Sequence, residues 1–329
     1  MEEILQHIQE VLGVPAFLIN HCTFLPEYIK DALITSINFI PWLYVLYYGI
    51  ELLERFFLTR INVFIRLIQK LGPLFGVGIS VIPECGYQVI ASTFYSRKMI
   101  SRGTLLAFYI SCSDDALPLL FLDFSKALVI IPIIVIKIIV GIIVAYSVDI
   151  VDTIIHRRIK PVEDINAINT DLNEPACCHH RIQTKENPAY WWMHPLTHTF
   201  NMFMFTFLSL ALINCVVLGF GSVENLASFL MIDTPYQLVG TALLGLVSNC
   251  VTSVFLAIAY VKGIIGFPAL ISGLVSVTGL GLFTLVKRNQ NSNDNTIITI
   301  ILVAAAIITG LFVYYNLAVV NMIKDLFIK

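Results

Sequence analysis

Long apolar stretches constrain this chain more than any other feature of its sequence. Six of them approach the roughly 20 residues that a helix needs to cross the hydrocarbon core of a membrane. Only 13% of the residues are charged, against about 25% in an ordinary soluble domain. The sequence therefore predicts an all-α polytopic membrane protein that crosses the lipid bilayer several times. The six predicted spans are 32–54, 103–122, 127–150, 197–220, 266–286 and 296–323.

Two further apolar stretches are long enough to span but are interrupted near the middle. The stretch 72–95 is broken at Pro83-Glu84-Cys85-Gly86, and the stretch 237–260 at Ser248-Asn249-Cys250. A proline removes a backbone donor and bends a helix, and a glycine loosens it. Each stretch is therefore either a bent crossing or a re-entrant hairpin, which enters and leaves the membrane on one side.

The two interrupted stretches belong to an internal repeat. Residues 81–120 align with residues 246–285, and in that register Cys85 falls on Cys250 and Tyr95 on Tyr260. Identity is low, but the same order recurs: a broken apolar run around a cysteine, a tyrosine, a basic residue and a second apolar helix. Interrupted segments in corresponding halves of a membrane protein point to the substrate site of a transporter.

The distribution of basic residues favours the hairpin interpretation. Basic clusters lie at 55–70, 97–102, 157–160 and 287–288. If both interrupted stretches are hairpins, all four clusters fall on one side, as the positive-inside rule requires of the cytoplasmic side. Each half then crosses the membrane three times, so the second half is inverted relative to the first.

The expected architecture is thus two inverted repeats, each of three transmembrane helices plus one re-entrant broken-helix hairpin. The hairpins would enter from opposite faces and bring Cys85 and Cys250 together at mid-membrane. The first membrane repeat would occupy 1–150, a hydrophilic cytosolic loop 151–195 and the second membrane repeat 196–329.

Three charged residues fall near the middle of predicted spans. Asp114 and Asp115 lie in the middle of 103–122, and Lys137 lies in the middle of 127–150. Charges at that depth are costly, normally pair with one another and mark an ion path. We expect one carboxylate to bind substrate or a proton, and Lys137 to balance its charge. A purely structural Asp–Lys pair between neighbouring helices is the alternative.

Polar residues at the interruptions complete the predicted ion path. Cys85 and Cys250 hold equivalent places in both repeats, which favours binding over simple space filling. Asn249, Thr252 and Ser253 can equally cap broken helix ends, because orphan backbone groups need partners. Cys85, Cys250, Asp114 and Asp115 are the candidate metal ligands. The full predicted path is Glu84, Cys85, Gln88, Cys112, Asp114, Asp115, Lys137, Asn249, Cys250 and Ser253.

The hydrophilic loop contains the tract Cys177-Cys178-His179-His180. A short Cys/His-rich tract is typical of metal binding. Four adjacent residues cannot all reach one ion in tetrahedral geometry, however, and the C-x₂-C spacing of a zinc site is absent. The tract is either a loose site that captures or senses metal, or a chance enrichment.

Several classes of function are disfavoured. The net charge of −2 predicts no nucleic-acid partner, since such proteins carry basic patches. Neither a nucleotide-binding loop nor a Gly-x-Ser-x-Gly elbow occurs, so neither an ATP-driven pump nor a hydrolase is expected. We expect no enzyme and no cofactor. The sequence leaves open whether the chain forms a homo-oligomer.

The segments 82–120 and 248–282 resemble the family of putative ten-helix heavy-metal exporters, bacterial proteins often labelled putative manganese transporter or arsenic efflux protein. The Cys/His-containing loop and the stretch HPLTHTF at 194–200 agree with that resemblance. Counting each hairpin as two half-helices gives ten membrane segments, as the family description requires. Ser248 stands where a proline would sharpen the second break.

The resemblance implies an inner (plasma) membrane secondary transporter that exports a divalent heavy-metal ion such as manganese by alternating access. Thiolate ligands conflict with manganese, which prefers oxygen. Two alternatives stay open: a carrier of an organic solute or anion, including organoarsenicals, and a non-transporting membrane scaffold or sensor.

Overall fold

The computed structural model describes most of the apolar part of the chain. Every regular element among the described residues is an α-helix, and five segments are long and apolar enough to cross a membrane. The predicted all-α, multi-pass class is therefore confirmed for this part of the chain. The described residues are 26–58, 68, 71–80, 86–112, 116–120, 129–154, 190–232, 234–247 and 250–316.

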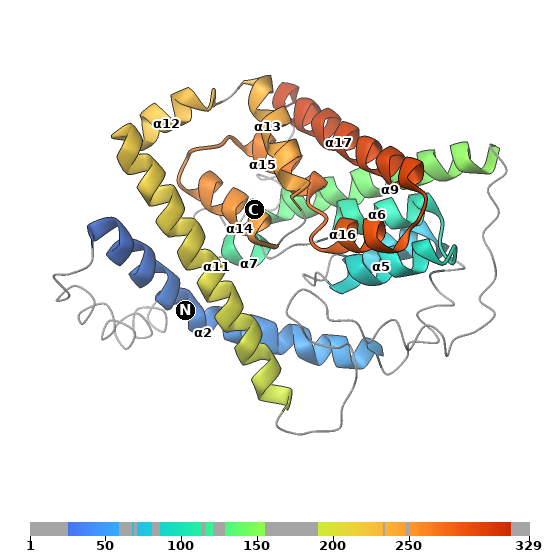
Figure 1. The fold of residues 1–329 in the computed structure, drawn as a ribbon, viewed down its shortest axis with the longest axis horizontal. Helices are drawn as coiled ribbons and strands as arrows, with labels where there is room; N and C mark the ends of the chain where they lie inside the picture. The colour runs from blue at the N-terminus through green and yellow to red at the C-terminus, as the bar shows by residue number, and fades with distance from the viewer. Residues whose placement is uncertain are drawn as a thin grey trace, which may run out of the picture.

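The helices fall into two series of similar order (Figure 1). The first series is α2 (Glu27–Leu58), α4 (Pro73–Ser80), α5 (Gly86–Ser96), α6 (Arg102–Ser111), α7 (Ala116–Leu120) and α9 (Ile130–Ile154). The second is α11 (Tyr190–Phe220), α12 (Val223–Phe229), α13 (Pro235–Gly245), α14 (Cys250–Val261), α15 (Phe267–Ser276), α16 (Gly281–Arg288) and α17 (Ser292–Tyr315).

The register predicted from sequence relates the two series helix by helix. It places α6 on α15 residue for residue and α2, α4, α5, α7 and α9 on α11, α13, α14, α16 and α17. The turns agree as well: Lys98 (φ 61°) and Gly263 (φ 74°) are equivalent and both left-handed. Helix contacts also repeat, because α6 packs on α4 and α9 just as α15 packs on α13 and α17.

Two of the predicted spans are not continuous helices. In 103–122, α6 ends at Ser111 and Cys112 leaves the helix with ψ 125°. In 266–286, α15 ends at Ser276, Val277 has ψ 121° and Gly279 is left-handed at φ 47°. Apolar length could not predict these breaks because the runs are apolar on both sides. The second break has a local cause, because Gly279 tolerates the left-handed turn.

This break corrects the placement of Asp114 and Asp115 within one continuous helix. Residues 113–115 lie outside the described residues, between α6 and α7. The other four predicted spans correspond to α2, α9, α11 and α17. Helix α9 continues to Ile154 and α11 begins at Tyr190, so both ends of the predicted 151–195 loop are helical.

The second predicted interruption is present, because α13 ends at Gly245, Leu246 and Val247 are not helical, and α14 begins at Cys250. The first falls between α4 and α5, on residues 81–85, which lie outside the described residues. In each pair of helices, the start of the first helix lies near the turn that follows the second helix. A Cβ on Gly72, just before α4, would lie 3.4 Å from Thr104 Oγ1 in the first turn of α6, directly after the turn that follows α5. The Gln237 amide near the start of α13 bonds Ile264 O (3.3 Å) and Gly266 N (3.1 Å), between α14 and α15.

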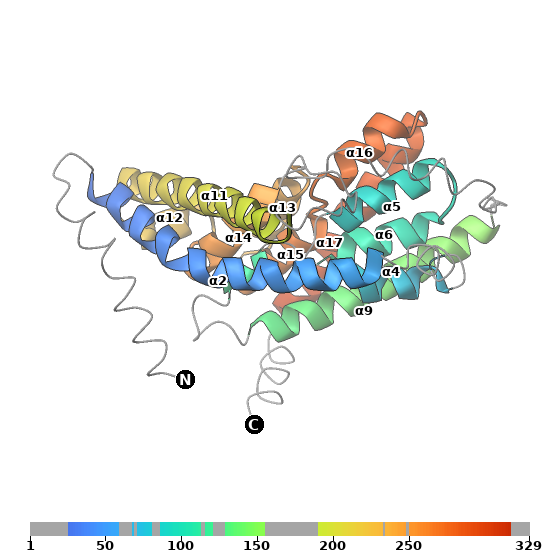
Figure 2. The ribbon, with the colours of Figure 1, turned by 90° about the horizontal axis from the view of Figure 1, so that it is seen from below.

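Equivalent long helices pair in opposite directions. Asn214 near the end of α11 bonds Tyr28 O near the start of α2 (3.0 Å). Further along, the rings of His198 and Tyr47 lie edge to face with centroids 4.3 Å apart. This α2–α11 pair forms an arm on one side of the molecule, whereas α9 and α17 flank the broken helices (Figures 1 and 2).

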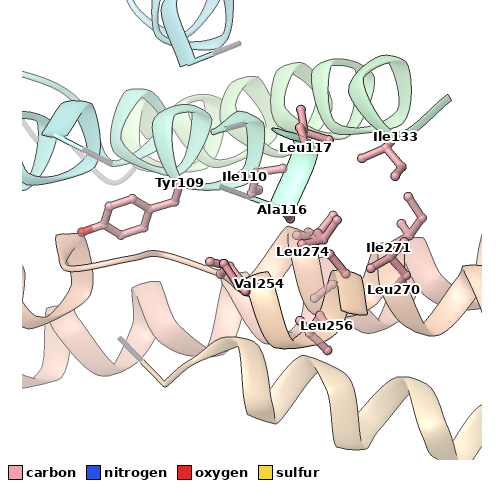
Figure 3. Close-up of a cluster of buried hydrophobic side chains, with 14 of the residues drawn as sticks. Tyr109, Ile110, Ala116, Leu117, Ile133, Val254, Leu256, Leu270, Ile271 and Leu274 are labelled. Carbon is pink, nitrogen blue, oxygen red and sulfur yellow. The ribbon is translucent and has the colours of Figure 1, made fainter. Parts of the chain in front are cut away.

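The apolar core lies where the broken helices of the two series meet. Figure 3 shows Ile133 of α9 pointing toward Ile271 of α15, and Ala116 of α7 close to Leu274 of α15. All four side chains are buried, as are most residues of α6 and α15. The core thus joins the two halves rather than filling each separately.

Candidate functional site

The broken segments of each half lie against those of the other. Helix α5 of the first half packs on α16 of the second, and α14 of the second packs on α7 of the first; Figures 1 and 2 show α5, α6 and α16 side by side. Ser92 of α5 lies 2.8 Å from Gly281 O and 2.6 Å from the Tyr109 hydroxyl. The helix breaks therefore converge inside the bundle.

The close packing of α16 against α5 and α6 requires a glycine at position 281. Gly281 is the first residue of α16, and a Cβ there would lie 2.8 Å from the Tyr109 ring and 2.9 Å from Gln88 Cβ. Real Cβ atoms do not approach so closely, so a larger residue would push α16 away from α5 and α6. Gln88 consequently lies along the α15–α16 break, where its Nε2 makes a long hydrogen bond to Val277 O (3.5 Å).

Lys137 lies at the meeting point of two broken helices. Its side chain is only 2% exposed, and Nζ donates to Cys112 O (2.5 Å) and to Leu274 O (2.9 Å). Cys112 caps the end of α6, and Leu274 belongs to the last turn of α15. Carbonyls at a helix C-terminus lack intrahelical donors and carry the negative end of the helix dipole, so they favour a cation.

Two buried oxygen atoms near the α15–α16 break have no hydrogen-bond partner among the described residues. They are Gln88 Oε1 and Thr278 Oγ1, and both side chains are fully buried. Buried polar groups are normally satisfied, so exceptions often mark ligand or water positions. The break therefore offers oxygen ligands in an otherwise apolar bundle.

The structure places part of the predicted ion path. Gln88, Cys112, Lys137 and Ser253 are described and buried. Cys250 begins α14, although its side chain lies outside the described set. In the described part of the chain, no three His, Cys, Asp or Glu side chains lie close enough together to hold a metal ion. The remaining predicted residues lie outside it: Glu84, Cys85, Asp114, Asp115, Asn249, Cys177, Cys178, His179 and His180.

Sequence reasoning missed the backbone partners of Lys137. It paired the ammonium with Asp114 or Asp115, whose structure is not described. Carbonyl acceptors at positions 112 and 274 could be predicted only by recognising the breaks after Ser111 and Ser276. Thr278 was missed for the same reason, whereas a Thr-Gly pair inside an apolar run is a signal that could have found it.

A second polar group ties the two halves together at one end of the molecule. Arg102, at the start of α6, bonds Asp152 near the end of α9 (2.6 Å) and Asp294 near the start of α17 (2.8 Å). Tyr95 donates to the same Asp294 (2.7 Å). Burial alone would lower the pKa of Arg102, but its hydrogen bond to Asp294 and the charge of Asp152 help raise it above the ordinary value.

This group bears on the predicted topology. It brings the turn at 97–102 and the polar segment at 287–295 to the same end, as the sorting of basic clusters required. Asn289 also donates to Asp294 (3.0 Å), so the contact is more than a single ion pair. Helix α9 ends and its equivalent α17 begins at this end.

A separate cavity of about 530 Å³ lies between α11, α12, α13 and α14. None of its lining residues is charged, and its Gln237 amide already bonds the α14–α15 turn. The cavity therefore lacks the ligands that an ion needs, and the site remains at the helix breaks.

Comparison with known proteins gives one match. The chain matches, over residues 21–222, the model of a family described as "Putative, 10TM heavy-metal exporter". No curated protein and no solved structure matches it. The match covers more than half of the chain, from before α2 to the end of α11. The chain, a multi-pass helical membrane protein, therefore belongs to this family.

Proposed function

We propose that this protein is an inner-membrane secondary transporter that exports a divalent heavy-metal ion, manganese among the candidates, by alternating access around its helix breaks. Membership of the exporter family supports the substrate class. The observation that carries the mechanism is the convergence of broken helices from both halves at buried polar atoms. Irregular backbone at membrane depth is tolerated only where it is buried or lines a cavity.

The inverted repeat is part of this proposal. Equivalent helices α2 and α11 run antiparallel, because Tyr28 meets Asn214 and Tyr47 meets His198. Equivalent helices α9 and α17 also run oppositely, since the end of one and the start of the other meet at Arg102. These two independent pairs support a second half that is inverted in the membrane, which is the usual basis of alternating access in secondary transporters.

The same contacts support the proposed re-entrant hairpins. The α4–α5 segment begins near the start of α6 and ends at Tyr95, beside the Arg102 group. The α13–α14 segment likewise begins and ends at the α14–α15 turn. On an inverted repeat these two ends lie on opposite faces. With that arrangement, the hairpin tips, including Cys85 and Cys250, would approach each other near the breaks after α6 and α15.

We assign the metal path to the residues around these tips. Cys85 and Cys250 would supply thiolates, Asp114 and Asp115 oxygen ligands, and Glu84, Gln88, Asn249 and Ser253 further polar contacts. Cys112 would contribute its buried thiol, and Lys137 would offset charge when no metal is bound. The Cys177–His180 tract would collect metal on the cytosolic side. Mixed sulfur and oxygen ligands suit zinc or iron better than manganese.

A carrier of an anionic solute is the second candidate. Helices α5 and α14 begin at the interruptions, and the N-termini of half-helices receive negative groups in transporters. Lys137 adds a buried positive charge to the same region. Such a protein would move an oxyanion or an organic acid, and its site would not need the two cysteines.

Metal flux into inverted vesicles distinguishes the candidates. We expect accumulation of one or more divalent metals in vesicles with the wild-type protein, and loss of accumulation in Cys85→Ser and Cys250→Ser. Cys215→Ser is the matched control, because Cys215 is an exposed free cysteine of α11. A deletion strain should contain more of the same metal when challenged. Flux of an anion with both cysteine variants active would contradict metal export and favour the second candidate.

A further inference from the structure

Lys137 has a role that does not depend on which substrate is carried. We propose that its ammonium is a tethered replacement for a free monovalent cation, held in a seat formed by the C-terminal carbonyls of α6 and α15. The seat comprises Cys112 O and Leu274 O, which accept hydrogen bonds from Nζ at 2.5 and 2.9 Å. In transporters with broken helices, such carbonyl ends coordinate small cations.

The two helices bring negative ends to one point from opposite directions. Helix α6 begins at Arg102, at the end where α17 also begins. Helix α15 begins at the other end, because a Cβ on Gly310, late in α17, would lie 3.3 Å from Pro268 O. Both helices stop before they complete a crossing. Their terminal carbonyls therefore face each other without intrahelical donors, and a cation between them satisfies both helix dipoles.

The ammonium that occupies this seat belongs to Lys137 of helix α9. The helix is continuous from Ile130 to Ile154, so it holds the lysine at a fixed depth beside two interrupted helices. The equivalent position in α17 is Leu302, which is fully buried. One cation fills a seat shared by both halves, so a second lysine would place two like charges together. This explains why the repeat carries a lysine at one of the two equivalent positions and leucine at the other.

A lysine ammonium that already fills the seat should prevent free monovalent cations from binding there. Potassium and ammonium ions are similar in size to the lysine head group, and carbonyl oxygens are suitable ligands for all three. The wild-type seat is already filled, so these ions should not compete for it. Removing the lysine head group should leave an oxygen-lined vacancy that a free monovalent cation can occupy.

Thermal unfolding of the purified full-length Lys137→Met variant tests the proposal. Unfolding is followed in KCl, NH₄Cl or choline chloride at constant ionic strength. A ligand that binds only the folded state raises stability with the logarithm of its concentration. We therefore expect the melting temperature of Lys137→Met to rise with potassium or ammonium, relative to choline. Wild type and the matched control Leu302→Met should show no such difference.

Each outcome decides the proposal. A folded Lys137→Met variant with the same melting temperature in all three salts would overturn it. If that variant is recovered folded only when ammonium or potassium is present throughout purification, the seat is supported. If neither ion recovers it, Lys137→Ala, which also leaves the seat empty, is measured in the same series, and an absent ion preference there would overturn the proposal. The melting temperature reports ion binding and not transport. The result can therefore be interpreted even if the Lys137→Met variant no longer exports metal.

Discussion

The two halves of this protein share a backbone plan but differ in the side chains at equivalent positions. In the first half, α9 carries Lys137 and α6 begins with Arg102; in the second, α17 carries Leu302 and α15 begins with Phe267. The end of the molecule with Arg102 is held by ion pairs with Asp152 and Asp294. At the α14–α15 turn, which is equivalent to the α5–α6 turn beside Arg102, Tyr260 instead packs against Phe267, with ring centroids 6.2 Å apart.

This difference separates what the repeat determines from what single residues determine. The order of the helices, the ends of α6 and α15, and the left-handed turns at Lys98 and Gly263 are common to both halves. These features follow from apolar runs and backbone-breaking residues. The charges are not common to both. The repeated architecture therefore supplies the broken helices that meet inside the bundle. Individual substitutions make one end of the molecule ionic, the other end aromatic and the centre positively charged.

The largest expected effect comes from removing the ionic contact. Arg102→Met would leave Asp152 and Asp294 without their shared cation, and breaking a buried ion pair destabilises by about 3–5 kcal/mol. The equivalent change, Phe267→Leu, removes only part of an apolar contact and should cost about 1 kcal/mol. Denaturation of the purified variants measures both. Equal losses at the two positions would show that the ends do not differ as described.

Removing the central charge should have the next largest effect. Lys137→Met deletes two charge-assisted hydrogen bonds, each worth about 1.5–3 kcal/mol, partly offset by relief from burying the ammonium. We expect a loss of about 2–4 kcal/mol when unfolding is measured in choline chloride. Leu302→Met, the equivalent change, keeps the volume and should cost less than about 1.5 kcal/mol. A loss at Leu302 as large as at Lys137 would refute the asymmetry of the centre.

A pair of small residues sharpens the comparison at the breaks. Gly281 and Ala116 are equivalent first residues of α16 and α7. Gly281→Ala would introduce a Cβ against Tyr109 and Gln88, and overpacking of this kind costs about 1–3 kcal/mol. Ala116→Gly should cost only about 0.5–1 kcal/mol, through backbone entropy. The reverse order of melting temperatures would mean that α16 can move away freely from α5.

The smallest expected effect on stability belongs to Thr278. Its hydroxyl lacks a partner among the described residues, so Thr278→Val should change stability by less than about 1 kcal/mol. If this oxygen contacts the transported ion, the same change should slow metal flux roughly threefold to tenfold, the value of one hydrogen bond. Thr309→Val is the control, because that hydroxyl bonds Ala305 O of its own helix (2.6 Å). Unchanged flux would remove Thr278 from the path.

The sequence predicted the membrane class, four continuous spans, the repeat register and the interruption before Cys250. These features are local, since they depend on apolar length and on proline, glycine or polar residues within a run. It also identified Lys137 as buried, because a charge in a long apolar helix must be accommodated inside the bundle.

The partners of the charged residues were not predictable in the same way. Arg102 and Asp294 are 192 residues apart in the chain, and nothing in either local sequence specifies the other. Lys137 donates to backbone carbonyls, which every residue has, so the acceptors became apparent only once α6 and α15 were seen to stop at Ser111 and Ser276. Non-local packing, rather than residue type, decided both contacts.

Accessibility of two equivalent turns tests the central claim, an inverted repeat, most directly. Arg97 and Lys262 occupy the same position in the α5–α6 and α14–α15 turns. Single cysteines at each, in a protein otherwise free of cysteine, are labelled with a membrane-impermeant maleimide in intact cells and in inverted vesicles. With an inverted repeat, Arg97→Cys should react only from the cytoplasmic face and Lys262→Cys only from the opposite face. Labelling of both positions from the same face would contradict it.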